Sequence, residues 1–88
     1  MKPFESIDQF LNLPSGSIVA RAYGKGEHRH VTELTVCERT GDQMQFAVFG
    51  QTIPTVAAHV GGLVLEEGRV VRKAPDNKWN AVQYAWLK

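Results

Sequence analysis

The chain has 88 residues, of which 43% are hydrophobic and 22% are charged, and its net charge is +1. This length allows one domain with one core, and the composition excludes disordered and fibrous classes. No apolar run reaches the roughly 20 residues that a membrane-spanning helix needs. The opening residues contain acids and no apolar signal region, and Cys37 is the single cysteine. We therefore expect a cytoplasmic protein without a secretory signal or a disulfide.

A short helix is predicted near the N-terminus. Ser6 is a suitable N-cap, and Gln9 three residues later completes a capping box. An apolar stripe that includes Phe10 and Leu11 follows at helical spacing. We expect residues 1–14 to plug one end of the β structure that follows, or to dock a partner.

Three strands are predicted next, over residues 17–23, 31–38 and 44–49, with a turn at residues 40–42. Because side chains alternate between the two faces of a strand, one face of the second strand carries Leu34 and Val36. The third strand alternates more clearly, and we place in the core its three apolar residues Met44, Phe46 and Val48.

A second helix is predicted after the third strand. Thr52 can cap it, Pro54 is tolerated in its first turn, and Gly61 can adopt the left-handed conformation that ends it. The buried stripe of this helix would contain Val56, Ala57 and Val60.

Two further strands complete the expected structure. The fourth covers residues 63–74, with a bulge or bend at Gly68, and the fifth covers residues 79–87 after a turn at residues 75–78. Three strands, a helix and two strands are the element order of the OB-fold, a five-stranded Greek-key barrel. We therefore predict an all-β single domain over residues 1–88, with the barrel at 17–87 and short helices.

The chain resembles the nucleic-acid-binding OB family, including domains of replication protein A, OB domains of replicative polymerases and anticodon-binding domains of tRNA synthetases. The pattern is a strand that ends in an acid-x-Thr/Ser-Gly turn, a strand that ends in Phe-Gly, a short helix, and then glycine before a hydrophobic strand. The matching residues are Glu38, Thr40, Gly41, Phe49, Gly50, Gly61 and Gly62. The resemblance implies a ligand path across strands two and three, bounded by the loops after strands one and four.

Positive charge is concentrated in two windows of the sequence. Residues 21–30 and 69–78 together hold seven cations and two acids, a net +5, whereas the rest of the chain holds three cations and seven acids, a net −4. Such a local positive field attracts phosphate even when the total charge is small. The two windows fall at the two loops that bound the expected ligand path.

Cations in these windows would follow the phosphates, and aromatic rings would stack on bases. The candidate nucleic-acid-binding residues are Arg21, Tyr23, Lys25, Arg29, His30, Phe49, Arg69, Arg72, Lys73, Lys78 and Trp79.

Several of the aromatic residues also allow a structural interpretation. Trp79 follows the basic turn and is the preferred stacking residue, although it could lie at the end of the core. Tyr84 and Trp86 share a face with Val82, which favours core packing. Phe49 could cover the second helix instead of a ligand.

A metal site is not expected. His28 and His30 form an H-x-H pair, and Cys37 is the one plausible further ligand, which is short of a stable zinc site. No triad spacing, phosphate loop or paired carboxylate cluster indicates catalysis, so we expect no enzyme and no cofactor.

The sequence therefore predicts a single-stranded-DNA-binding protein of low sequence specificity, with DNA favoured over RNA. An RNA-binding OB protein is an alternative. A second alternative is an interaction module of a replication or repair complex, which would use Phe4, Phe10 and an exposed sheet edge. A homodimer that extends the groove is a further expectation.

Overall fold

A computed structural model describes residues 2–24, 27, 29–72 and 82–87 of the chain. Among these residues, no helix has the length and apolar character needed to cross a membrane. One helix, α1 (Ile7–Leu11), precedes the strands. The strands are β1 (Ile18–Tyr23), β2 (His30–Thr40), β3 (Gln43–Val48), β4 (Val56–His59), β5 (Leu63–Glu66), β6 (Arg69–Arg72) and β7 (Val82–Trp86).

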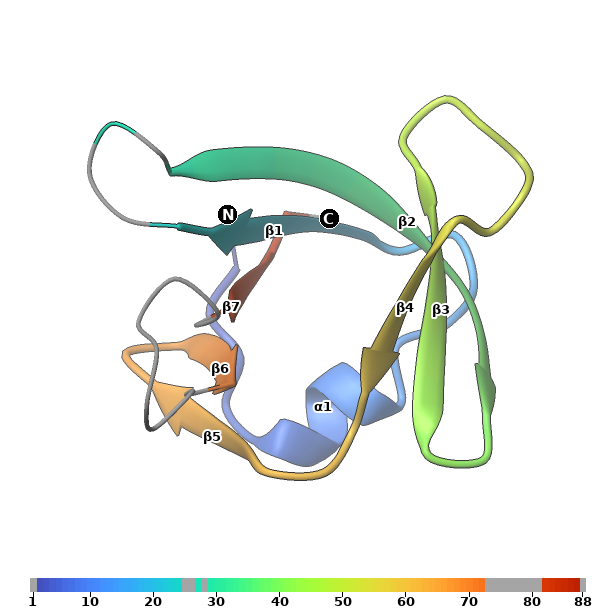
Figure 1. Cartoon of the computed structure of the whole chain (residues 1–88). Coiled ribbons are helices and arrows are strands. Elements are labelled where there is room, and N and C mark those ends of the chain that lie inside the picture. Colours follow the sequence, from blue (N-terminus) through green and yellow to red (C-terminus); the bar gives the residue numbers. More distant parts are fainter. Residues whose placement is uncertain (1, 25–26, 28, 73–81, 88) are drawn as a thin grey trace.

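All seven described strands belong to one antiparallel sheet, in the order β4-β3-β2-β1-β7-β6-β5. The pairing of β1 with β7 joins an N-terminal meander of four strands to a C-terminal group of three. The sheet is strongly curled into a half-barrel, and α1 lies between its two ends (Figure 1). The prediction of an all-β fold is therefore confirmed in class, whereas the predicted number of five strands is wrong for the described chain.

The core lies on the concave side of the half-barrel, which we call the inner face. Leu34 of β2 is opposite Val19 of β1 and Val48 of β3, and Leu34 and Val19 are fully buried. Met44 and Phe46 are also almost fully buried, and Val48 packs against the core at partial exposure. The predicted alternation of strands two and three is confirmed by these positions.

The predicted N-terminal helix is confirmed as α1. The Ser6 hydroxyl accepts the Gln9 N–H at 3.2 Å, and the Gln9 side-chain oxygen accepts the Glu5 N–H at 2.7 Å. Phe10 has no exposed surface, and its ring centre lies 4.9 Å from that of Tyr84 in β7 and 6.4 Å from that of Phe46 in β3. One side chain of α1 thus contacts both halves of the curled sheet.

The helix predicted after the third strand is wrong. A loop leads instead to β4, which pairs with β3 through Val56 opposite Phe46 and Ala58 opposite Met44. Small apolar residues in this segment fit both a helical and an alternating pattern, and pairing with β3 satisfies the backbone groups of both strands. After β4, the glycine with a left-handed backbone conformation is Gly62, with φ of 75°, and not Gly61 as predicted.

The predicted long fourth strand is a hairpin of β5 and β6. Glu67 and Gly68 have φ angles of 52° and 78° and form the two-residue turn between them. A Cβ atom at Gly68 would lie 2.7 Å from the Cβ atom of Pro3, so glycine also allows the N-terminal segment to pack closely against this turn. Strand β7 lies within the predicted fifth strand, and the predicted turn at 75–78 lies outside the described residues.

Candidate nucleic-acid interface

The candidate cations divide between the two faces of the sheet. Arg21 is opposite Tyr84 in the β1–β7 pair, and Tyr84 is opposite Val70 in the β7–β6 pair, so Arg21 shares the inner face with these core residues. Arg72 has the same parity as Val70 and also belongs to the inner face. Arg69 has the opposite parity and belongs to the convex side, which we call the outer face. The cations that were expected to line a single groove therefore form two separate groups, one on each face of the sheet.

The inner-face group contains an aromatic stack. Tyr23 of β1 is opposite His30 of β2, and their ring centres are 5.2 Å apart at an interplanar angle of 27°. The Arg21 guanidinium carbon lies 4.8 Å from the centre of the Tyr23 ring. Tyr23 therefore already makes ring contacts with two neighbours, and the exposed member of the stack is His30.

Both inner-face arginines contact other parts of the fold. Burial raises the pKa of Tyr84, and a side-chain hydrogen bond with Arg21 and the charges of Arg21 and Arg72 oppose this rise. The Arg72 guanidinium donates to the backbone carbonyl of His59, at the end of β4. Arg21 and Arg72 thus interact with Tyr84 and His59 of the protein itself, which leaves them less available to a ligand.

The outer-face group surrounds a shallow hollow. Arg29 and Arg69, both exposed, line a space of about 160 Å³ together with Val31 and Gln83. The floor of the hollow consists of the small side chains of Ala20, Ala22 and Ala85. Because alanine has no side chain beyond Cβ, a ligand in this hollow, which both arginines line, can approach the sheet closely.

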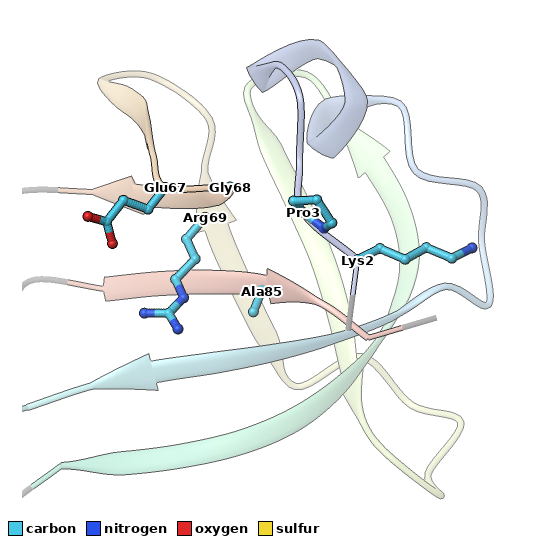
Figure 2. Close-up of a pocket in the computed structure, with 6 residues that line it drawn as sticks. All are labelled: Lys2, Pro3, Glu67, Gly68, Arg69 and Ala85. Atoms are coloured by element: carbon cyan, nitrogen blue, oxygen red, sulfur yellow. The ribbon is translucent and has the colours of Figure 1, made fainter.

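A second hollow adjoins the first at Arg69. It has a volume of about 180 Å³ and is lined by Lys2, Pro3, Glu67, Gly68, Arg69 and Ala85. Figure 2 shows Arg69 and Glu67 on one side of this hollow, whereas the Lys2 side chain extends away from them. The Lys2 ammonium lies 5.1 Å from the centre of the Trp86 ring, so its charge is held at a different position from that of Arg69.

Phe49 extends the outer face across the sheet. Its N–H donates to the Glu33 carbonyl at 3.0 Å, and the strand alternation places it on the same face as Ala47. The side chain of Phe49 is 54% exposed. One row across the outer face therefore contains Phe49, Glu33, Ala20, Ala85 and Arg69, and we call it the outer strip.

The outer strip crosses five neighbouring strands, β3, β2, β1, β7 and β6. These strands are separated by four spacings of about 4.8 Å, so the strip is roughly 19 Å long across the sheet. An aromatic ring lies at one end and a guanidinium group at the other. Arg29 lies beside the strip, at the hollow. This combination of ring, small-residue floor and cations suits a flexible polyanion with flat bases.

Four of the predicted site residues, Lys25, Lys73, Lys78 and Trp79, lie outside the described residues. Of the others, the structure brings Arg29 and Arg69 together at one hollow and places Phe49 on the same outer face, whereas Arg21, Tyr23, His30 and Arg72 lie on the inner face. Sequence reasoning missed the alanine floor and Gln83. The signal was present as Ala20 and Ala22 at alternate positions of β1, the faces of which were not assigned, and as Ala85 on the face of β7 opposite to Tyr84 and Trp86.

The ambiguous aromatic residues of β7 are core residues. Tyr84 is 4% exposed, and Trp86 packs against the core with its ring stacked on Phe4 at 5.5 Å. Phe4 and Phe10 are buried as well, so they cannot form the exposed docking surface that the protein-interaction alternative assigned to them. The described residues contain no group of three or more His, Cys, Asp or Glu side chains that could hold a metal ion.

Comparison with protein-family models, with curated proteins and with solved structures finds no match to this chain.

Proposed function

We propose that this protein binds single-stranded DNA, with low sequence specificity, along the outer strip. The observation that carries the proposal is the alanine-floored hollow between Arg29 and Arg69, in line with the exposed ring of Phe49. The arginines bind phosphates, and Phe49 stacks on a base.

Each part of the strip supplies a different component of binding. Guanidinium groups form paired hydrogen bonds with phosphate oxygens and carry a charge at all accessible pH values. A base stacked on an aromatic side chain contributes about 1–3 kcal/mol whatever its identity. Glu33 lies between the ring and the hollow and opposes a phosphate above it, so the strip favours a strand whose phosphates lie over β1 and β7 rather than β2.

The fold is compatible with this proposal at the level of a curled antiparallel sheet. We propose that the half-barrel is a variant of the OB barrel, in which β4 replaces the helix and a hairpin replaces one long strand.

The proposal is tested by fluorescence anisotropy with a labelled dT oligomer of about 20 nucleotides, at low and physiological salt. The wild type is expected to bind, with an affinity that falls as salt rises because neutralised phosphates release counterions. The double variant Arg29→Ala/Arg69→Ala should bind about 10- to 30-fold more weakly at low salt, at roughly 1 kcal/mol for each exposed contact. Its slope of log affinity against log salt should fall by about 1.4, since each lost phosphate contact on a single strand removes about 0.7.

Arg39→Ala is the matched control, because it removes an exposed positive charge at the opposite end of β2. This end is about 30 Å from His30 along the strand. Equal weakening by Arg39→Ala and by a single Arg29→Ala or Arg69→Ala change would show that net charge, and not the hollow, governs binding. Tighter binding of the matching RNA oligomer would transfer the proposal to RNA.

A protein partner is the second candidate function. Val31 and Ile53 are 61% and 71% exposed, and with Phe49 they make parts of the described surface apolar. Binding of single-stranded nucleic acid does not need all of these apolar side chains, whereas a protein partner could cover them. If the protein shows no binding to DNA or RNA at low salt, this candidate replaces the first.

A further inference from the structure

Strand β5 forms one end of the described sheet, with β6 as its one strand neighbour and with α1 in contact with it. Two of its apolar side chains are unusually exposed, Val64 at 42% and Leu65 at 38%. They point to opposite faces, because Val64 is opposite Val71 and Leu65 is opposite Val70 in the β5–β6 pair. Free sheet edges usually carry charged residues, proline or bulges that prevent further pairing. The segment Leu63–Leu65 has none of these.

The hairpin determines which backbone groups face the free edge. Glu66 and Arg69 flank the two-residue turn and form its closing hydrogen-bonded pair. Hydrogen-bonded and non-hydrogen-bonded pairs alternate along an antiparallel ladder, so Val64 also directs its N–H and C=O towards β6. The N–H and C=O groups of Leu63 and Leu65 therefore point away from β6.

We propose that β5 pairs in antiparallel orientation with β5 of a second copy of this chain, with Val64 on the two-fold axis. Leu63 of each copy then forms a hydrogen-bonded pair with Leu65 of the other, which gives four hydrogen bonds across the axis. The two Val64 side chains meet on the outer face, and the leucines meet on the inner face. A shift of the register by one residue would exchange the inner and outer faces of one copy, and a shift by two residues would place a carboxylate opposite an apolar side chain. The register with Val64 on the axis avoids both and is therefore favoured.

The charges at the two ends of β5 are complementary in this arrangement. The C-terminal end of β5 is followed by Glu67 in the turn, whereas the N-terminal end lies beside Arg72, which is opposite Leu63 and close to Gly62. Antiparallel pairing brings the acidic end of one copy next to the basic end of the other. This complementarity favours a second copy over an unrelated extended peptide.

The opposite end of the sheet is less suited to such pairing. At β4, the His59 carbonyl already accepts a hydrogen bond from Arg72, and the His59 ring contacts the Asp42 carboxylate at 3.1 Å. The His59 Nδ1 atom also accepts the Gly61 N–H at 3.1 Å. These contacts occupy the end of β4, whereas β5 presents the free edge with exposed apolar side chains.

Pairing through β5 would place two outer faces side by side in one continuous sheet. The two copies of Arg69 then lie on either side of the axis, and the two outer strips form one longer surface. This consequence rests on the proposed function, whereas the pairing itself does not.

Cross-linking tests the pairing and its register without nucleic acid. In a Cys37→Ser background, Val64→Cys places two cysteines at a non-hydrogen-bonded pair with a Cα separation of about 4.5 Å, within the range that a disulfide spans. Glu66→Cys is the matched control on the same strand, because its copies would lie about 14 Å apart along the strands. Ile53→Cys is a second exposed control, in the loop before β4.

The expected result is oxidation of Val64→Cys to a covalent dimer about 10-fold faster than either control, at a protein concentration of about 100 μM. Val64→Lys should shift the uncross-linked protein to monomer in sedimentation equilibrium, and Ile53→Lys should leave its dimer unchanged. A wild-type monomer at this concentration, or equal cross-linking of Glu66→Cys, would overturn the inference. DNA binding by such a monomer would leave the proposed function standing and refute the pairing alone.

Discussion

The inner and outer faces of the half-barrel contain the same residue types and use them differently. On the inner face, Arg21 and Arg72 contact an aromatic ring and a backbone carbonyl of the protein itself. On the outer face, Arg29 and Arg69 line an open hollow above alanines. The difference shows that a cluster of cations in the sequence is a candidate site only after each cation has been assigned to a face.

Strand β6 illustrates this difference within four residues. Arg69 and Arg72 begin and end the strand, and an odd separation of three places them on opposite faces. Between them, Val70 and Val71 are both buried, so each face of this strand is covered at its centre. The two arginines therefore form a natural matched pair for experiments.

Phenylalanine substitutions should give the largest contrast between the faces. Phe10→Ala removes a fully buried ring that contacts Phe4, Phe46 and Tyr84, and it should lower the free energy of unfolding by about 3–5 kcal/mol. Phe49→Ala should change stability by less than about 0.5 kcal/mol and weaken oligonucleotide binding instead. Urea denaturation and anisotropy measure the two effects, and a large stability loss in Phe49→Ala would contradict the assignment of faces.

The arginine pair of β6 should give the next largest effects. Arg72→Met loses the hydrogen bond to the His59 carbonyl and should reduce stability by about 1–2 kcal/mol, with affinity for the dT oligomer within about twofold of the wild type. Arg69→Met should keep its stability and lower affinity about five- to tenfold at low salt. If Arg72→Met weakens binding as much as Arg69→Met does, the inner face belongs to the site as well.

The local pattern of the N-terminal half was predictable from the sequence, because each element there has a distinct period. Ser6 and Gln9 identify the start of α1, and the alternation of Met44, Phe46 and Val48 identifies the core face of β3. The segment at 52–61 was not predictable in the same way. Its small apolar residues suit either period, and the pairing with β3 that decides between them is a tertiary interaction.

The candidate site was predictable in composition but not in arrangement. Charge segregation identified Arg29 and Arg69, and the strand ending in Phe-Gly identified Phe49. The hollow between the arginines depends on the register that brings Ala20 opposite Ala85. The register is set by pairing between strands that are far apart in the sequence, and the amino-acid composition does not determine this pairing.

Tyr84 provides an alkaline test of the inner face. Burial raises the pKa of this phenol, so the folded protein retains a proton that the unfolded chain loses near pH 10. The contribution of Tyr84 to stability is therefore complete below about pH 10 and is lost as pH rises through the higher folded value. The Tyr23→Phe variant leaves Tyr84 as the sole tyrosine. In a pH titration of this variant, the absorbance of the Tyr84 tyrosinate should appear above pH 10. Tyrosinate formation at or below pH 10 would indicate an exposed phenol.

Glu33 should give the smallest effect and the finest test of the outer strip. Its exposed carboxylate lies between Phe49 and Ala20, where it repels a phosphate across water and salt. Glu33→Gln should raise the affinity for the dT oligomer about twofold at low salt, and the gain should disappear at high salt because screening removes the repulsion. Glu38→Gln makes the same charge change at an exposed position five residues further along β2, about 17 Å from Glu33, and should leave the affinity unchanged. Equal gains in the two variants would mean that the bound oligonucleotide does not cross β2 at Glu33. The proposed path from Phe49 to Arg69 would then be wrong.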